Sequence, residues 1–72
     1  MLVFRVVDAK GNPIKKAKVT VKGTDGVDAT AWSDRRGFVA EPITGGQHGK
    51  VLVNDKEVYE GSLLVEEIVA DL

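Results

Sequence analysis

The amino-acid sequence predicts an all-β fold, a small antiparallel β-sandwich of six or seven short strands. Apolar and polar residues alternate with a period of two in several segments, and turn signals separate these segments every eight to twelve residues. Alternation places one face of a strand on a core and the other in water, so short strands at this spacing favour two packed sheets. Since neither an internal repeat nor a linker interrupts the 72 residues, we expect a single domain over residues 1–72.

The first third of the chain predicts two strands and the turn between them. Residues 2–7 form the first strand, and residues 16–22 form the second. Between them the sequence DAKGNP predicts a long turn, because glycine adopts positive φ readily and proline cannot donate to a ladder. The residues expected on the core face are Leu2, Phe4, Val6, Ala17, Val19 and Val21.

The middle of the chain predicts four further short strands, over residues 29–33, 38–41, 50–53 and 58–61. The sequence DRRG (34–37) fits a type I turn of a bulged hairpin, with aspartate first and glycine in the left-handed position. Residues 54–57 predict a four-residue turn. The segments GTDGVD (23–28) and ITGGQHG (43–49) predict irregular loops.

The last eleven residues, SLLVEEIVADL, fit two secondary structures. At 100° per residue the large apolar side chains fall within one arc, as in an amphipathic helix with Ser62 as its cap. The valines and isoleucine favour a strand instead.

Two turn motifs at a defined separation resemble those of a known family. The pattern is Val7-Asp8, Gly11-x-Pro13-Ile14 and Ala17-x-Val19-x-Val21, followed by Ser33-Asp34-x-x-Gly37-Phe38. It resembles the carboxypeptidase regulatory-like family, which has a transthyretin-like (prealbumin-like) or immunoglobulin-like β-sandwich of seven strands, as do the related collagen-adhesin B-type modules. The resemblance covers residues 3–53.

The family resemblance has consequences for the tail and for function. Family members often finish with a strand that ends in leucine, which residues 68–72 supply, so we favour a terminal strand. The chain departs from the family at Val39, where an aromatic residue is usual, and at Gln47-His48-Gly49, where Gly-x-Tyr is usual. The implied function is mainly architectural, that of an accessory domain that stabilises or spaces a larger protein and sometimes binds a partner or a polysaccharide.

Composition and charge narrow the classes of partner. The chain lacks cysteine, and no run approaches the ~20 apolar residues of a membrane helix. Residues 1–36 carry eight basic and four acidic side chains, and residues 37–72 carry two basic and seven acidic ones. This asymmetry fits a basic face for an anionic partner or head-to-tail pairing of oppositely charged poles. It also fits mutual neutralisation of the two halves within one domain, which we favour. Because no aromatic residues interleave the lysines, we do not expect nucleic acid as a partner. The lack of a long apolar run argues against a membrane as a partner.

Enzymatic and metal chemistry are not expected. Tyr59-Glu60-Gly61-Ser62 looks like the Tyr-Arg-Gly-Ser signature of hydroxyisourate hydrolases, but glutamate replaces the arginine and His48 is the single histidine. His48 fits a solvated loop residue better than a general base, because no nucleophile sits at a motif spacing beside it. Asp25 and Asp28 suit calcium ligands, yet the calcium-loop pattern is absent. We therefore predict no cofactor and no metal.

Trp32 has two interpretations. If it is exposed, its ring serves as a platform for a sugar or as an anchor for a protein partner. If it is buried, it forms the centre of a core that has only four aromatic residues to draw on, and this interpretation is favoured.

The sequence thus predicts a non-enzymatic structural or protein-interaction module, acting through a protein partner or self-association. The first alternative is a carbohydrate-binding module that uses Trp32, and the second is a hydrolase built on His48 and Tyr59. A small sandwich must guard or pair its sheet edges, and the lysines of residues 16–22 are candidates for guards. We expect the cytoplasm if the chain is complete and the extracellular space if it is a module of a longer protein. The candidate binding residues are Trp32, Arg35, Arg36, His48 and Tyr59.

Overall fold

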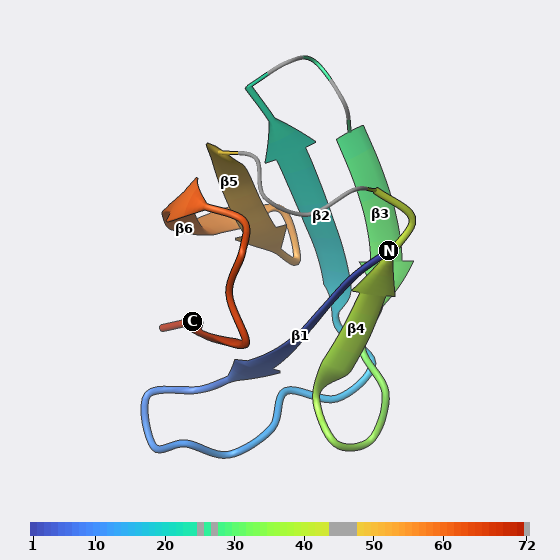
Figure 1. The fold of residues 1–72 in the computed structure, drawn as a ribbon. Coiled ribbons are helices and arrows are strands. Elements are labelled where there is room, and N and C mark those ends of the chain that lie inside the picture. Colours follow the sequence, from blue (N-terminus) through green and yellow to red (C-terminus); the bar gives the residue numbers. More distant parts are fainter. Residues whose placement is uncertain (25, 27, 44–47, 72) are drawn as a thin grey trace.

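A computed structural model describes residues 1–24, 26, 28–43 and 48–71, and seven strands lie in this part of the chain (Figure 1). The strands are β1 (Leu2–Val7), β2 (Lys18–Gly23), β3 (Asp28–Trp32), β4 (Phe38–Glu41), β5 (His48–Val53), β6 (Lys56–Ser62) and β7 (Glu67–Val69). They form a three-stranded and a four-stranded sheet, which confirms the predicted all-β sandwich. The described residues include no helix long and apolar enough to cross a membrane.

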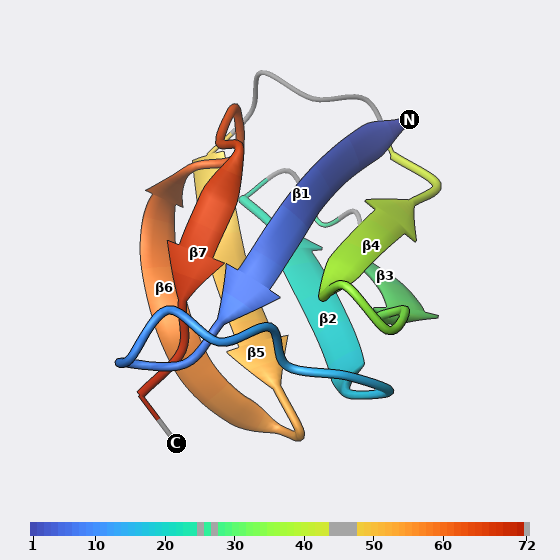
Figure 2. The same ribbon diagram turned by 90° about the horizontal axis from the view of Figure 1, so that it is seen from below.

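Each sheet draws strands from both halves of the chain. The three-stranded sheet has the order β4-β1-β7 and the four-stranded sheet the order β3-β2-β5-β6, and Figure 2 shows the first layer in front of the second. Neighbouring strands are antiparallel except β1 and β7, which run parallel with Val6 opposite Ile68. Strands of the basic half and of the acidic half are therefore neighbours in both sheets.

Ion pairs cross between the two halves at Arg5 and Lys18, two of the eight basic residues in the first half. Arg5 Nη1 lies 3.8 Å from Glu67 Oε2, and Lys18 Nζ lies 3.2 Å from Asp55 Oδ1. The lysines of residues 16–22 have a different role from the one expected, because β2 is an inner strand of its sheet. The idea that they guard a sheet edge is wrong, and the alternation instead turns them toward the outer face.

The core forms where the predicted apolar faces of the two sheets meet. All six residues expected on that face are 5% exposed or less. Phe4 is the largest of the fully buried side chains, and aliphatic residues surround it. The buried residues that complete the cluster are Val39, Ile43, Val51, Val53, Leu63, Ile68 and Ala70.

The connection from β1 to β2 crosses from one sheet to the other through the predicted long turn. Asp8 Oδ1 accepts hydrogen bonds of 2.9 Å from the main-chain N–H groups of Lys10 and Asn12. Gly11 has a φ of 85°, in the region that favours glycine. The turn predicted from the sequence DAKGNP is thus present.

The turn over residues 34–37 has the predicted geometry but joins different partners. Gly37 has a φ of 82°, and Asp34 Oδ1 accepts hydrogen bonds from the main-chain N–H groups of Arg36 (2.8 Å) and Phe38 (3.0 Å). However, β3 pairs with β2 while β4 pairs with β1, so the two strands belong to different sheets. The expected hairpin is wrong, and the turn is a corner of the sandwich.

The β5–β6 hairpin has a shorter turn than predicted. Asn54 and Asp55 have φ values of 52° and 70°, and Val53 already pairs with Lys56. Two positive φ angles characterise the type I′ turn, which matches the twist of the flanking strands. The four-residue turn over residues 54–57 is therefore wrong.

The C-terminal segment is a strand, as favoured from the sequence. The main-chain N–H of Arg5 donates to the Glu66 carbonyl (2.9 Å), and that of Ala70 donates to the Val7 carbonyl (2.7 Å). These bonds pair the tail with the free edge of β1, and Ile68 is only 2% exposed. Pairing along β1 satisfies main-chain groups that a helix would have left without partners.

Candidate functional site

The outer face of the three-stranded sheet carries exposed apolar side chains. Val3 lies opposite Ala40 on this face, and Val3, Phe38 and Val69 are 53%, 43% and 55% exposed. We call these residues (Val3, Phe38, Ala40 and Val69) the apolar face. It continues into a shallow hollow of about 670 Å³, whose lining includes the exposed side chains of Met1 and Leu64.

Arg5 crosses the middle of the apolar face. Its guanidinium carbon lies 6.0 Å from the centre of the Phe38 ring, and it faces Glu67 on β7. The Nε atom also donates a 3.0 Å hydrogen bond to the Arg36 carbonyl. These contacts hold the cation flat against the sheet, so the face combines exposed apolar area with one positive and one negative charge.

Trp32 is exposed, and the favoured core interpretation is wrong. The side chain is 66% exposed at the end of β3, an edge strand of the four-stranded sheet. Ala29 and Ala31 are the residues of β3 that pack against the core. Alternation along the strand therefore turns Trp32 outward, beside Lys18, its cross-strand neighbour.

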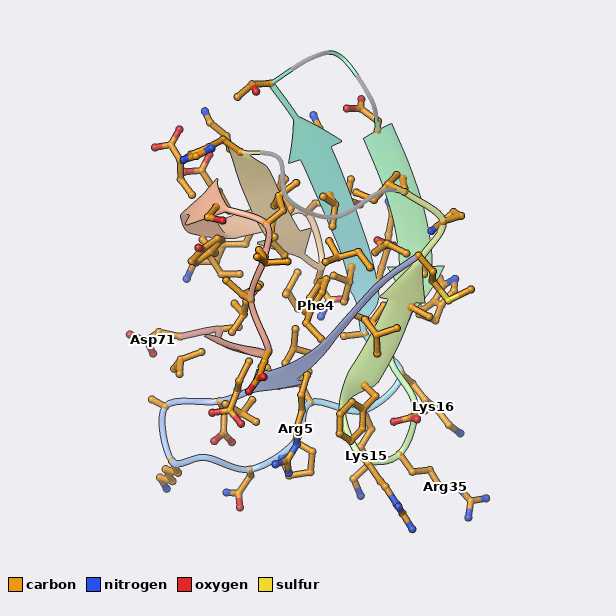
Figure 3. All side chains as sticks on the ribbon, viewed as in Figure 1. Phe4, Arg5, Lys15, Lys16, Arg35 and Asp71 are labelled. Atoms are coloured by element: carbon orange, nitrogen blue, oxygen red, sulfur yellow. The ribbon has the colours of Figure 1, made fainter. Side chains whose placement is uncertain are left out.

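Arg35 and Arg36 follow Trp32 along the chain, so the structure brings three of the five candidate residues together. Both arginines are exposed in the corner turn between β3 and β4. Lys15 and Lys16 lie at the same end of the sandwich as Arg35 (Figure 3). This end of the molecule is consequently basic.

His48 and Tyr59 lie apart from this end, on β5 and β6. The Tyr59 hydroxyl donates a 2.6 Å hydrogen bond to the Ser62 carbonyl, and the ring packs against the core. His48 is the register partner of Ser62, but it is exposed and alternation turns it to the outer face. It lines a hollow of about 330 Å³ with Lys50. The two side chains therefore do not converge on one point, as a shared acid–base site would require.

A buried carboxylate is the feature that sequence reasoning missed. Glu41 is fully buried (0% exposed), and neither of its carboxylate oxygens has a hydrogen-bond partner within the described residues. Burial raises the pKa of this carboxyl to about 7, because an apolar surrounding disfavours the charged form. The signal was present in the sequence FVAE, where Glu41 shares the strand face of Val39.

No group of three or more histidine, cysteine or acidic residues is placed to hold a metal ion in residues 1–24, 26, 28–43 and 48–71. Of the two calcium candidates, Asp28 is exposed at the start of β3, and Asp25 lies outside the described residues.

The fold places the chain among small two-sheet all-β sandwiches. No protein-family model, no curated protein and no solved structure matches it.

Proposed function

We propose that this protein is a non-enzymatic interaction module of the carboxypeptidase regulatory-like type, and that the apolar face is its contact surface for protein. The exposure of Val3, Phe38 and Val69 on one sheet face carries this proposal. Several exposed apolar side chains on one sheet face are characteristic of protein contacts, and here they flank the ion pair between β1 and β7. The family assignment is supported by the seven strands in two sheets and by the positive φ of Gly11 and Gly37, the glycines of its two turn motifs.

A second copy of the chain is the partner that the apolar face fits best. A two-fold interface brings one patch against itself, so the patch must be complementary to itself. Arg5 and Glu67 give the face one charge of each sign. Rotation about a two-fold axis can place Arg5 of each copy opposite Glu67 of the other. Association would also add apolar burial to a 72-residue core that has no disulfide.

The test is the solution mass by light scattering over a concentration series, with thermal unfolding recorded on the same samples. The wild type should form dimers, and its melting temperature should rise with concentration. The double variant Val3→Lys/Val69→Lys should be monomeric, because it places two cations in the contact. Thr30→Lys, an exposed position on the outer face of the other sheet, serves as the control and should leave the dimer intact. A wild type that is monomeric throughout, or equal dissociation in the control, would contradict the proposal.

A carbohydrate-binding module is the second candidate, and the 66% exposure of Trp32 favours it. A tryptophan on a strand face presents a flat ring on which a sugar stacks. The emission of Trp32 should lie at long wavelength and be quenched by added acrylamide. Binding of a sugar should shift the emission. Trp32→Ala removes the only tryptophan, so its binding is measured by heat, and it should be abolished without a change in solution mass. Emission at short wavelength that resists the quencher would rule out the platform.

A further inference from the structure

Four exposed cations gather at one end of the sandwich on two neighbouring loops. Lys15 and Lys16 lie in the connection that leads into β2, and Arg35 and Arg36 lie in the corner turn between β3 and β4. We call these four residues the basic tip, and Figure 3 shows Lys15, Lys16 and Arg35 at the same end of the molecule. None of the ion pairs found within the described residues involves them. Asp34 lies in the same turn, where its Oδ1 accepts two main-chain hydrogen bonds. The four cations outnumber this carboxylate, so positive charge is available to a ligand.

Ser33 fixes the two loops side by side. Its buried hydroxyl donates a 2.7 Å hydrogen bond to the Ile14 carbonyl and accepts one of 2.9 Å from the Ala17 N–H. Its carbonyl accepts a 3.1 Å hydrogen bond from the N–H of Lys16, and its own N–H donates to the Ala17 carbonyl (3.0 Å). Four hydrogen bonds from one residue thus hold the lysine loop against the start of the arginine turn.

Close backbone packing adds to this restraint. A Cβ atom on Gly37 would come within 2.5 Å of the Val6 carbonyl oxygen and 3.0 Å of Pro13 Cβ. The arginine turn therefore lies directly against the end of β1 and the connection from β1 to β2. The Arg36 carbonyl accepts the hydrogen bond from Arg5 Nε. The main chain of the basic tip is therefore fixed before any ligand arrives, which lowers the entropic cost of binding.

Lys16 occupies a backbone conformation that lysine rarely adopts. Its φ is 51°, in the left-handed region where glycine or asparagine would be cheaper. Strained residues concentrate at functional sites, where the surrounding structure holds them in place. Lys16 therefore combines a costly backbone conformation with an exposed charge at the basic tip.

Trp32 adds a flat apolar platform to the side of the basic tip. It directly precedes Ser33 in the chain, and its cross-strand neighbour Lys18 lies two residues after Lys16. A ligand that uses both features needs a ring with an apolar face and closely spaced negative groups. A single exposed tryptophan suits one sugar ring better than a run of stacked bases, which needs several aromatic side chains.

We propose that the basic tip and Trp32 together bind a linear anionic polysaccharide, with a sugar ring on the indole and sulfate or carboxylate groups on the four cations. Arginine forks match these groups with paired hydrogen bonds, and lysine ammonium groups attract them as point charges. The inference rests on the carbohydrate-binding candidate, whose ligand class it specifies, and is independent of the apolar face.

The experiment titrates the protein with oligomers of dextran sulfate and with uncharged dextran of the same length, following Trp32 fluorescence and heat. The wild type should bind the sulfated chain and should bind it less tightly as salt is added. Arg35→Ala/Arg36→Ala should weaken binding about tenfold or more. This variant should fold, because both side chains are exposed and Arg36 serves the turn through its main-chain atoms. The control Lys22→Ala/Lys56→Ala removes the same charge at exposed positions on other strands and should bind like the wild type.

Each other outcome overturns the inference in a recognisable way. Equal weakening in the control would show unspecific charge attraction. Equal binding of both dextrans would leave the carbohydrate-binding candidate standing without an anionic ligand, whereas binding of neither would end both. Tighter binding of a single-stranded oligonucleotide, or of phosphatidylserine vesicles, would assign the basic tip to a different class of partner. Self-association through the apolar face is decided separately, by the solution mass of the free protein.

Discussion

Replacing Glu41 by glutamine should remove a pH dependence of stability that the wild type carries. The carboxyl is fully buried without a hydrogen-bond partner within the described residues, and its pKa rises from 4.5 to about 7. Because one pKa unit corresponds to about 1.4 kcal/mol, ionising this carboxyl in the folded protein costs about 3 kcal/mol. That is a large share of the stability of a small domain.

The sign follows from proton binding. Between pH 4.5 and about 7 the folded protein holds this proton while the unfolded chain releases it. Stability therefore falls as the pH rises through this window and levels off above it. Asp8 acts in the opposite direction at lower pH, since main-chain hydrogen bonds from Asn12 and Lys10 lower its pKa below 3.8. Its contribution is lost as the pH falls through that lowered pKa, outside the Glu41 window.

Urea unfolding from about pH 4 to pH 8 measures this effect. The free energy of unfolding of the wild type should drop by about 3 kcal/mol across the window, and that of Glu41→Gln should stay nearly level. At pH 8 the variant should be the more stable protein, although its buried amide offsets part of the gain. Glu66→Gln, at an exposed position, is the control and should retain the wild-type slope. If Glu41→Gln kept that slope as well, the carboxyl would not be desolvated and the reasoning would fail.

Two turns give further predictions, both measured as free energies of unfolding in urea. Gly37→Ala should cost more than Gly11→Ala, because both glycines have positive φ but only Gly37 has a backbone oxygen within 2.5 Å of the new methyl group. Equal losses would show that backbone conformation alone matters. Asp55→Gly should stabilise the β5–β6 hairpin by up to about 1 kcal/mol, because asparagine followed by glycine is the preferred type I′ pair. The lost ion pair with Lys18 is exposed and offsets little, and a net loss would show otherwise.

Local patterns predicted the strands because alternation records burial directly. The core faces of β1 and β2 are those read from the sequence, and the turn at Gly37 has the φ that its chemistry requires. The sequence wrongly paired β3 with β4. The same turn residues can join two strands of one hairpin or two strands of different sheets, and the two cases differ only in which other strands each one pairs with.

The candidate site was predicted in part. The sequence indicates Trp32 as a binding residue, but its large apolar ring also suits the core. Ala29 and Ala31 pack against the core, and the alternation along β3 therefore turns Trp32 outward. The sequence-based charge count includes Glu41 only as one of the seven acidic residues of the acidic half, although alternation from Val39 puts it inside. In both cases the position in the strand outweighed the chemistry of the side chain. The basic tip can be recognised only from the structure, because its two loops are separated in the sequence and are joined through Ser33.

Lys16→Gly separates stability from binding at the basic tip. The left-handed φ of 51° costs a lysine about 1–2 kcal/mol, and the greater freedom of glycine in the unfolded chain offsets about half of this. The free energy of unfolding of the variant, measured in urea, should therefore exceed that of the wild type by about 0.5–1 kcal/mol. Its affinity for dextran sulfate should be lower. Lys15→Gly loses the same charge without a positive φ to relieve, so it should weaken binding without stabilising the fold. A variant Lys16→Gly that is no more stable than the wild type would show that the surrounding hydrogen bonds, rather than retained strain, explain the position. A stability gain with unchanged binding would remove Lys16 from the proposed site and leave the strain without a functional reason.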